Sequence, residues 1–324
     1  MKFIIEYFAK PVKITIFAEN KCVMMNYTVI VPHKNVPKLL ERLLNSIPFR
    51  DDLEIIVVDD NSSDEIVDFN NFPFMGRTNY HVIFTKESHG AGYARNCAIP
   101  LAKGKWFLFA DSDDFINESF GDFLSEYVDS DADVIYFNAN SVDSDTLEPS
   151  SRVDHLHEFI DEYKHNEEHG ELILRYLFTE PWCKMVKKEL IQANNILFEE
   201  SRIRNDVRFS YLVGYYAKKI IVDYRQLYCV TTRKNSLSRD FTFEASMDEM
   251  KVYAGWKKFF VDHNIPLDVP KFDYRAYNFA RHLYKNNKLF RAEYRKMLEA
   301  GLSHTYIWGQ VIKYLWRSAK YKIG

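Results

Sequence analysis

The sequence predicts an α/β fold in which a mostly parallel central sheet is flanked by helices and followed by a helical C-terminal extension. In the first half of the chain, short apolar runs alternate with stretches of helical periodicity. From about Phe243 onward the pattern is typical of several helices. With 324 residues, 47% hydrophobic and 27% charged, the chain can build a large core and has the composition of a soluble globular protein.

Five apolar runs of four to six residues, rich in Val, Ile and Phe, predict buried strands. They cover residues 27–31, 54–58, 81–85, 105–110 and 134–137. Between the first two runs, residues 37–47 place their Leu and Ile side chains on one helical face. Asn35 is positioned to cap this helix, and Pro37 suits its first turn. This alternation predicts parallel strands with helices on both faces of the sheet.

We expect three regions along the chain. Residues 1–24 are a leader of uncertain role, because Lys, Glu and Pro interrupt any apolar core of a signal peptide. Residues 25–240 form the main domain, with halves at 25–140 and 141–240, and residues 241–324 form the helical extension. A membrane-spanning helix is not expected, since no run of 18 apolar residues occurs.

The cysteines, histidines and charges limit which classes of function the chain can have. Four widely spaced cysteines without a CxxC pair favour reduced, mostly buried thiols of a cytosolic protein. Four histidines between 155 and 169 lack tight metal-ligand spacing, so a solvated helix is favoured over a metal site. Residues 271–324 hold 12 Lys or Arg against three acidic residues, although the whole chain carries −3. This asymmetry predicts an acidic body joined to a basic tail that meets an anionic partner.

Polar residues follow four of the predicted strands. They lie at 32–35, 59–64, 89–96 and 111–114. The carboxyl ends of parallel strands meet at one edge of a sheet, where ligands of α/β proteins bind, so these residues predict a single pocket. Each segment taken separately could also be an ordinary turn with capping residues.

The fourth strand end carries three carboxylates, Asp111, Asp113 and Asp114. A hard divalent cation would neutralise such a cluster and would in turn hold phosphates. The alternative is an acidic turn in which Asp114 or Asn117 caps the next helix. Neither a GxGxxG turn after the first strand nor a GxxxxGK[ST] loop is present, so phosphate would have to be held by cations such as Arg95 and the metal.

Four segments together resemble the family 2 glycosyltransferases with the GT-A fold. They are TVIVPHKN at 28–35, EIIVVDDNSSD at 54–64, HGAGYARNCAI at 89–99 and FLFADSDD at 107–114. The resemblance covers roughly residues 26–240. It implies the nucleotide-diphospho-sugar transferase fold and an inverting, metal-dependent transfer of sugar from a nucleoside diphosphate sugar, most commonly a UDP-sugar. It also implies a glycan or lipid-linked acceptor hydroxyl, in bacterial surface polysaccharide biosynthesis at the cytoplasmic face of the membrane.

The resemblance also implies roles for single residues. Pro32 and the pair Asp59 and Asp60 would contact the base and ribose, and Arg95 would lie near the nucleotide or its phosphates. Asp111 would approach the ribose and the metal. Asp113 would coordinate Mn²⁺ or Mg²⁺ bridging the diphosphate, where the cation stabilises the leaving group.

In the second half, residues 181–184, 194–198 and 204–209 resemble the acceptor side of these enzymes. Asp206 matches the usual catalytic base, whereas Asn205 stands where many relatives have Glu. The alternative for Asp206 is a helix cap near Val207. Trp182 is either a sugar-stacking face or a core residue. In the loop expected at 229–239, Arg233 or Arg239 could close over the diphosphate, or the loop could simply be solvated.

The tail from Tyr306 to Lys322 has four cations, no acids, two Trp and three Tyr, which fits an amphipathic helix at a membrane surface. The alternatives are packing on the main domain or on a partner copy in a homodimer; the acidic body argues against nucleic acid. Two rival functions stay open. One is a degenerate glycosyltransferase-like subunit, suggested by Asn205. The other is a sugar-phosphate nucleotidyltransferase. Enzymes of that class have a Gly-rich basic loop after the first strand, and residues 32–35 do not resemble it.

Overall fold

The computed structural model describes residues 2–7, 10–15, 24–233, 243–267, 294–295, 298–299 and 303–320. The chain divides into two compact units. The first comprises Met1–Glu200 and Arg208–Lys234, and the second comprises Ser201–Val207 and Asn235–Gly324. The domain limits expected from the sequence stay a prediction.

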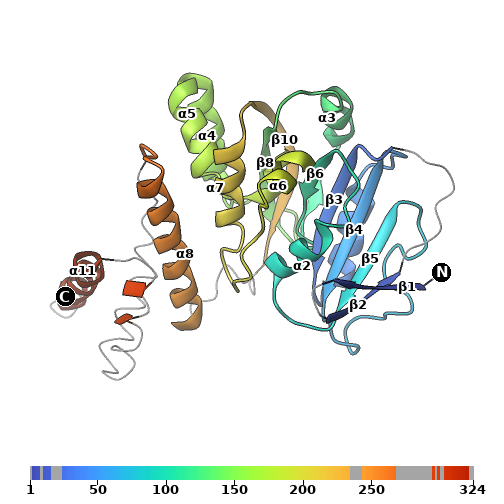
Figure 1. Ribbon diagram of the computed structural model, residues 1–324, viewed down its shortest axis with the longest axis horizontal. Helices are drawn as coiled ribbons and strands as arrows, with labels where there is room; N and C mark the ends of the chain where they lie inside the picture. The colour runs from blue at the N-terminus through green and yellow to red at the C-terminus, as the bar shows by residue number, and fades with distance from the viewer. Residues whose placement is uncertain are drawn as a thin grey trace. The chain divides into compact units, whose positions relative to one another are not determined.

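The first unit is built on one sheet whose strand order is β1-β2-β5-β4-β3-β6-β9-β8-β10-β7 (Figure 1). The strands are β1 Lys2–Tyr7, β2 Lys10–Thr15, β3 Tyr27–His33, β4 Leu53–Asp60, β5 Tyr80–Thr85, β6 Trp106–Phe109, β7 Phe115–Ile116, β8 Val134–Asp143, β9 Lys184–Lys187 and β10 Ile220–Thr232.

The centre of this sheet is parallel, as the sequence predicts. β5, β4, β3 and β6 pair with one another in parallel, and β8 pairs with β10 in parallel. β9 runs antiparallel between β6 and β8. β1 and β2 form an antiparallel hairpin that joins the sheet beside β5. The sequence did not predict this hairpin within residues 1–24.

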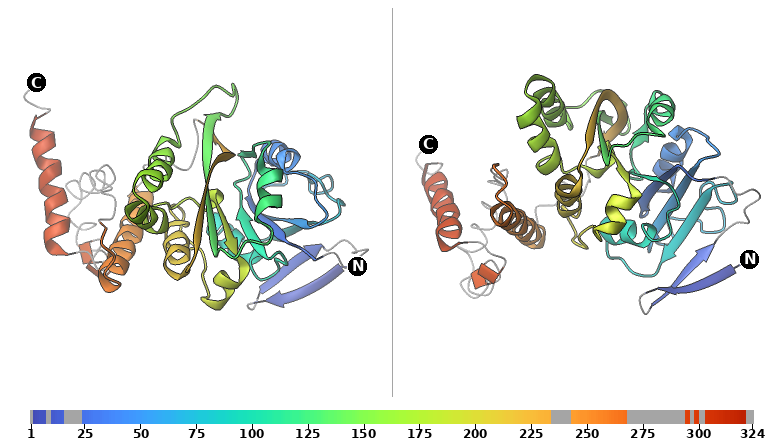
Figure 2. Two further views of the ribbon diagram at one scale, coloured as in Figure 1. Left: turned by 90° about the horizontal axis from the view of Figure 1, so that it is seen from above. Right: turned by 45° about the horizontal axis from the view of Figure 1, so that its top comes forward.

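Helices lie on both faces of this sheet (Figures 1 and 2). They are α1 Pro37–Ser46, α2 Ala91–Ala98, α3 Phe120–Tyr127, α4 Asp154–His165, α5 Glu167–Tyr176, α6 Lys188–Ala193 and α7 Val207–Tyr216, with a 3₁₀ turn at Pro181–Cys183. Since both faces are covered, every residue of β3 and β4 is buried, which explains their continuous apolar pattern. The described helices of the second unit are α8 Phe243–Asp262 and α11 His304–Lys320.

The start of α1 differs from the prediction. Pro37 does occupy the first turn, but the residue at the N-cap position is Val36, and no side chain caps the helix. Asn35 instead has a positive φ of 56°, a conformation that Asn tolerates better than most residues. Its Oδ1 accepts a hydrogen bond from the backbone N–H of Ser63 at 2.8 Å. Asn35 therefore connects the ends of β3 and β4 instead of capping α1.

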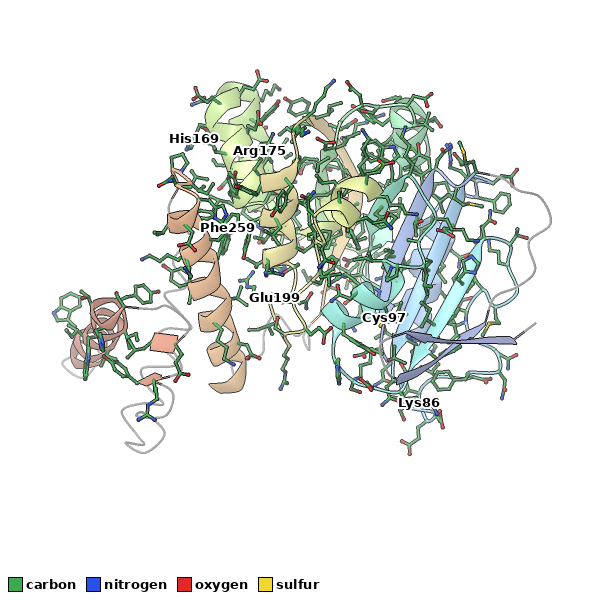
Figure 3. The ribbon with its side chains drawn as sticks, in the orientation of Figure 1. Lys86, Cys97, His169, Arg175, Glu199 and Phe259 are labelled. Atoms are coloured by element: carbon green, nitrogen blue, oxygen red, sulfur yellow. The ribbon has the colours of Figure 1, made fainter. Side chains whose placement is uncertain are left out.

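Arg175 on α5, which is labelled in Figure 3, fixes the C-terminal end of α7 through two hydrogen bonds. Its Nη1 donates to the carbonyl oxygens of Gly214 and Ala217, both at 2.6 Å. A Cβ at position 214 would lie 2.0 Å from the Arg175 carbonyl oxygen, so only glycine permits this close approach.

Candidate active site

The carboxyl ends of β3, β4, β5 and β6 lie at one edge of the sheet, and side-chain contacts join the segments that follow them. The Asn35 contact with Ser63 joins the segments that follow β3 and β4. Asp60 at the end of β4 accepts from backbone N–H groups of the segment after β5. Arg95 on α2 contacts Asp111 after β6. The polar segments predicted to meet at this edge are therefore connected in series.

Asp59 is held inside the protein by His33 and Ser62. The His33 Nδ1 lies 2.7 Å from Asp59 Oδ2, and the backbone N–H of Val36 donates to His33 Nε2. Because Nε2 accepts, Nδ1 carries the hydrogen given to Asp59. Ser62 donates to Asp59 from its Oγ at 2.6 Å and from its backbone N–H at 2.9 Å. Burial alone would raise the pKa of Asp59, but these hydrogen bonds outweigh it and lower the pKa below the ordinary value.

Asp60 shapes the start of α2. Its two carboxylate oxygens accept from the backbone N–H groups of His89 and Gly90, at 3.1 and 2.8 Å. Gly90 has a φ of 92°, which a side chain would strain, so glycine is needed where the chain turns into α2. The Lys34 ammonium lies 3.9 Å from Asp60. Pro32 lies next to these residues in β3 and is buried.

Asp111 pairs with Arg95. The guanidinium Nη2 lies 2.5 Å from Asp111 Oδ1. The Arg95 side chain is buried, whereas the Asp111 side chain is 35% exposed. Desolvation raises the pKa of Asp111, Arg95 opposes the increase, and the neighbouring Asp113 adds to it; the net shift is upward. The site thus keeps one accessible carboxylate beside the Arg95 guanidinium.

Asp113 is held from two directions. Its carboxylate contacts the guanidinium of Arg233, which follows β10. Its backbone carbonyl accepts from Arg42 on α1 at 2.6 Å and from the Thr231 hydroxyl at 2.7 Å. The Asp113 side chain is 25% exposed. A second accessible carboxylate thus sits beside a second arginine.

Asp114 does not cap the next helix, and neither does Asn117. The residue before α3 is Ser119, and no side-chain hydrogen bond caps that helix. Asp114 is buried and accepts from the Tyr228 hydroxyl at 2.9 Å and from the Thr231 backbone N–H at 2.7 Å. Burial raises the pKa of Asp114 well above its usual range, and the two neighbouring aspartates raise it further.

Tyr228 connects β10 to the turn at 111–114. Its hydroxyl donates to Asp114 and accepts the backbone N–H of Asp111 at 2.9 Å. Trp182 stacks on the Tyr228 ring, with centroids 5.1 Å apart and planes 13° apart. The Trp182 side chain is half-buried, so it packs on the core and still has an accessible part.

Nothing in the sequence marks Arg42, Tyr228 or Thr231 as site residues. Their side chains bind the turn from more than 70 positions away along the chain, and no local pattern marks them. Residues 229–232, which were expected in a loop, belong to β10. Arg239 lies outside the described residues.

Asp206 lies in the turn directly before α7 and is half-buried. It belongs to the second compact unit, together with Asn205. Its assignment as the catalytic base stays a prediction.

The described part of the chain contains no group of three His, Cys, Asp or Glu residues that could hold a metal ion. The histidines of α4 and α5 hydrogen-bond to protein oxygens instead: His155 to Glu180, His157 to Ala139, His165 to Asp161 and His169 to Glu162. Asp111 and Asp113 nevertheless offer two accessible carboxylates. Mg²⁺ is usually held by one or two carboxylates together with substrate phosphates and water. The donor set therefore fits a cation that a diphosphate helps to bind.

Residues 28–193 match the family described as glycosyl transferase family 2. The chain is 28% identical over 236 residues to the glycosyltransferase GlyG of Streptococcus pneumoniae, covering 70% of this chain and 78% of GlyG. It is also 28% identical over 219 residues to the poly(ribitol-phosphate) β-N-acetylglucosaminyltransferase TarS of Staphylococcus aureus, covering 65% of this chain and 36% of TarS. The chain thus matches only part of TarS.

Two solved structures have the same fold. Residues 1–349 of TarS from S. aureus, in complex with UDP-GlcNAc, superpose with a TM-score of 0.58 at 23% identity, covering 80% of this chain and 72% of that chain. The mannosyltransferase PcManGT from Pyrobaculum calidifontis, in complex with GDP-Man and Mn²⁺, gives a TM-score of 0.50 at 13% identity, covering 91% and 88%. Both likenesses concern the fold alone. The predicted GT-A fold and the predicted enzyme class, a glycosyltransferase, are confirmed.

Proposed function

This chain belongs to glycosyltransferase family 2, and we propose that it moves a sugar from a UDP-sugar to a hydroxyl group of a glycan or lipid-linked acceptor, with inversion at the anomeric carbon. The observation that supports this best is the pair of accessible carboxylates after β6, each beside an arginine. Two carboxylates of this kind would hold a divalent cation together with a diphosphate, and the neighbouring arginines would bind the phosphate oxygens.

The names of the relatives support this choice of donor and acceptor. TarS has been solved with UDP-GlcNAc and with UDP, and PcManGT with GDP-Man and Mn²⁺. TarS and a Bacillus spizizenii relative are named as transferases to poly(ribitol-phosphate). We therefore place the acceptor among bacterial cell-surface polymers or their lipid-linked precursors.

In the proposed reaction Asp113 and Asp111 would hold Mn²⁺ or Mg²⁺. When bound, the cation stabilises the negative charge that develops on the leaving diphosphate. Arg95 and Arg233, joined by Arg239, bind and orient the diphosphate. Asp206 takes the proton from the acceptor hydroxyl, which suits an Asp because its usual pKa of about 3.9 leaves it ionised at neutral pH.

The remaining predicted residues shape the nucleoside and sugar sides of the site. Asp60, whose oxygens accept from the His89 and Gly90 backbone, and the buried Pro32 fix the strand ends on the nucleoside side. Asp59, whose oxygens are engaged by His33 and Ser62, contributes by fixing the end of β4. The accessible part of Trp182 offers an apolar face to a sugar ring.

The test is a panel of UDP- and GDP-sugars, scored by thermal stabilisation with and without Mn²⁺ and then by release of the nucleoside diphosphate. We expect a UDP-sugar to raise the unfolding temperature only with Mn²⁺, because a ligand that binds the folded state stabilises it by mass action. Asp113→Ala should abolish both effects. Asp206→Asn should keep the stabilisation and lose turnover by about 100-fold or more, as expected for loss of a general base.

Asp145→Ala, at an exposed position of a turn, is the control and should behave like the wild type. Normal turnover in Asp113→Ala and Asp206→Asn would contradict these residue roles. Donor binding that never leads to release of the nucleoside diphosphate would instead support a binding-only subunit.

We further propose that the enzyme works at the inner face of the cell membrane, held there peripherally by α11. No described helix is long and apolar enough to span a membrane. Trp308, Ile312 and Trp316 recur every fourth residue and are 47%, 62% and 67% exposed, which forms an apolar stripe along α11. The basic composition of residues 271–324 complements anionic lipid.

Sedimentation with vesicles tests this association. The wild type should bind vesicles rich in phosphatidylglycerol more than phosphatidylcholine vesicles, and added salt should weaken binding. Replacing the three stripe residues with Ser should abolish binding. A stripe variant that binds vesicles normally but changes from dimer to monomer would show that α11 serves a homodimer.

A further inference from the structure

Glu249 is an anomaly on the buried face of α8. The described inward positions of this helix are apolar or aromatic except for Glu249: Ala245, Val252, Tyr253, Ala254, Trp256 and Phe260 are all buried. The Glu249 side chain is only 1% exposed. A carboxylate on such a face is costly unless it is paired, so its presence calls for a specific role.

Its partner is Arg204, two residues before Asp206. The Arg204 Nε donates to Glu249 Oε1 at 3.0 Å. Arg204 is 40% exposed, so the contact joins a buried acceptor to a cation at the protein surface. Both residues belong to the second compact unit, which contains Ser201–Val207 as well as α8.

The backbone of Arg204 is also constrained. Its φ of 56° lies in the left-handed region, which a long side chain adopts uncommonly and only when its surroundings hold it there. Its carbonyl accepts the backbone N–H of Val207 at 3.4 Å, which closes the turn. Ile203 and Val207 are buried on either side of this turn.

Asn205 and Asp206 are therefore the two residues between fixed points. Val207 anchors one end of the pair, and Arg204, held by Glu249, anchors the other. With only two residues between the anchors, a change in the Arg204 backbone would displace Asp206. The ion pair to α8 helps to maintain that conformation.

We propose that Glu249 is a positioning residue, which acts through Arg204 to orient Asp206 toward the acceptor hydroxyl. This inference rests on the proposed role of Asp206 as the base. It gives the second compact unit a role in the transfer step, separate from any contact with a membrane.

The test compares Glu249→Gln, Arg204→Met and the double variant in the full chain. The control is Asp248→Asn, one position along the same helix, which removes a contact to Lys251 at 3.1 Å instead. Calorimetry with UDP and Mn²⁺ gives the number of competent sites and the Kd. Turnover of the UDP-sugar selected by the donor panel is then expressed per competent site.

We expect UDP affinity to stay within about twofold of the wild type in every variant. Turnover per site should fall about 10- to 100-fold in each single variant, because small displacements of a reacting group cost this much. The double variant should be no slower than the slower single variant, since both changes break one contact. Arg204→Lys, which keeps the charge, should recover part of the loss seen in Arg204→Met.

Turnover per site in Glu249→Gln within twofold of Asp248→Asn would overturn the inference. Loss of UDP sites in step with turnover would overturn it as well, since that pattern indicates a general folding role. The result for Asp206→Asn separates the two proposals. If Asp206→Asn is fully active, the proposed base is wrong; if it is inactive while Glu249→Gln is normal, only the positioning role fails.

Discussion

Replacing Tyr228 with Phe removes one hydroxyl that makes two buried contacts. That hydroxyl accepts the backbone N–H of Asp111 and donates to Asp114, both at 2.9 Å. A buried polar group left without its partner costs roughly 1–3 kcal/mol, and Tyr228→Phe affects two such groups. Asp114 keeps the Thr231 N–H, so the cost is below the maximum. We expect the free energy of unfolding to fall by about 2–4 kcal/mol.

Urea denaturation measures this free energy, and Tyr80→Phe is the matched control. The Tyr80 hydroxyl is also buried, but no group in the described part of the chain hydrogen-bonds to it. Its removal should therefore change the free energy of unfolding by less than about 0.5 kcal/mol, or stabilise the protein slightly. Equal unfolding free energies for the two variants would refute the claim that Tyr228 holds the aspartate turn.

The same substitution should weaken the site itself. With the Asp111 backbone released from β10, the two accessible carboxylates are less well ordered before a ligand binds. A loss of about 1 kcal/mol corresponds to a roughly fivefold increase in the Kd for UDP with Mn²⁺. Calorimetry would detect this change, and Tyr80→Phe should leave the Kd unaltered.

Three further outcomes concern stability. Gly104→Ala should unfold at a clearly lower urea concentration, because a Cβ there would lie 2.5 Å from the Thr28 backbone nitrogen. Gly255→Ala in α8, whose added Cβ would meet nothing within 4 Å, should instead raise the free energy of unfolding by about 0.5–1 kcal/mol. An unchanged urea midpoint for Gly104→Ala would contradict the close approach of Gly104 to Thr28. Because the pKa of Asp59 is lowered by folding, this residue stabilises the protein above its unfolded pKa of about 4, and that contribution is lost as pH falls through the folded pKa. Between pH 6 and pH 3, Asp59→Asn should thus lose less unfolding free energy than the wild type, and equal losses would argue against the lowered pKa.

Periodicity and strand-end chemistry were enough to predict much of the site. The apolar runs predict β3, β4, β5, β6 and β8, although each strand end moves by up to several residues. Parallel pairing then places the polar segments after four of these strands at one edge. These features depend on short-range pattern, which a single sequence displays.

Contacts between distant parts of the chain could not be predicted in this way. Asn35 has the residue type and the position of a helix cap, yet it bonds to the segment after β4. Glu249 looks like an ordinary helix glutamate until its burial and its bond to Arg204 are seen. In both cases the side chain could have bonded to several different groups, and only the folded structure brings one of them within reach.

The sequence by itself determined the parallel core of the sheet, the helical character of residues 243–262 and 304–320, and the family, because local periodicity and motif order suffice for these. Tertiary structure decided which groups hold the aspartate turn after β6. Tyr228, Thr231 and Arg233 approach it from β10 and the residue that follows, more than 110 positions along the chain. No local pattern encodes such a pairing, since it arises only when β10 joins the sheet.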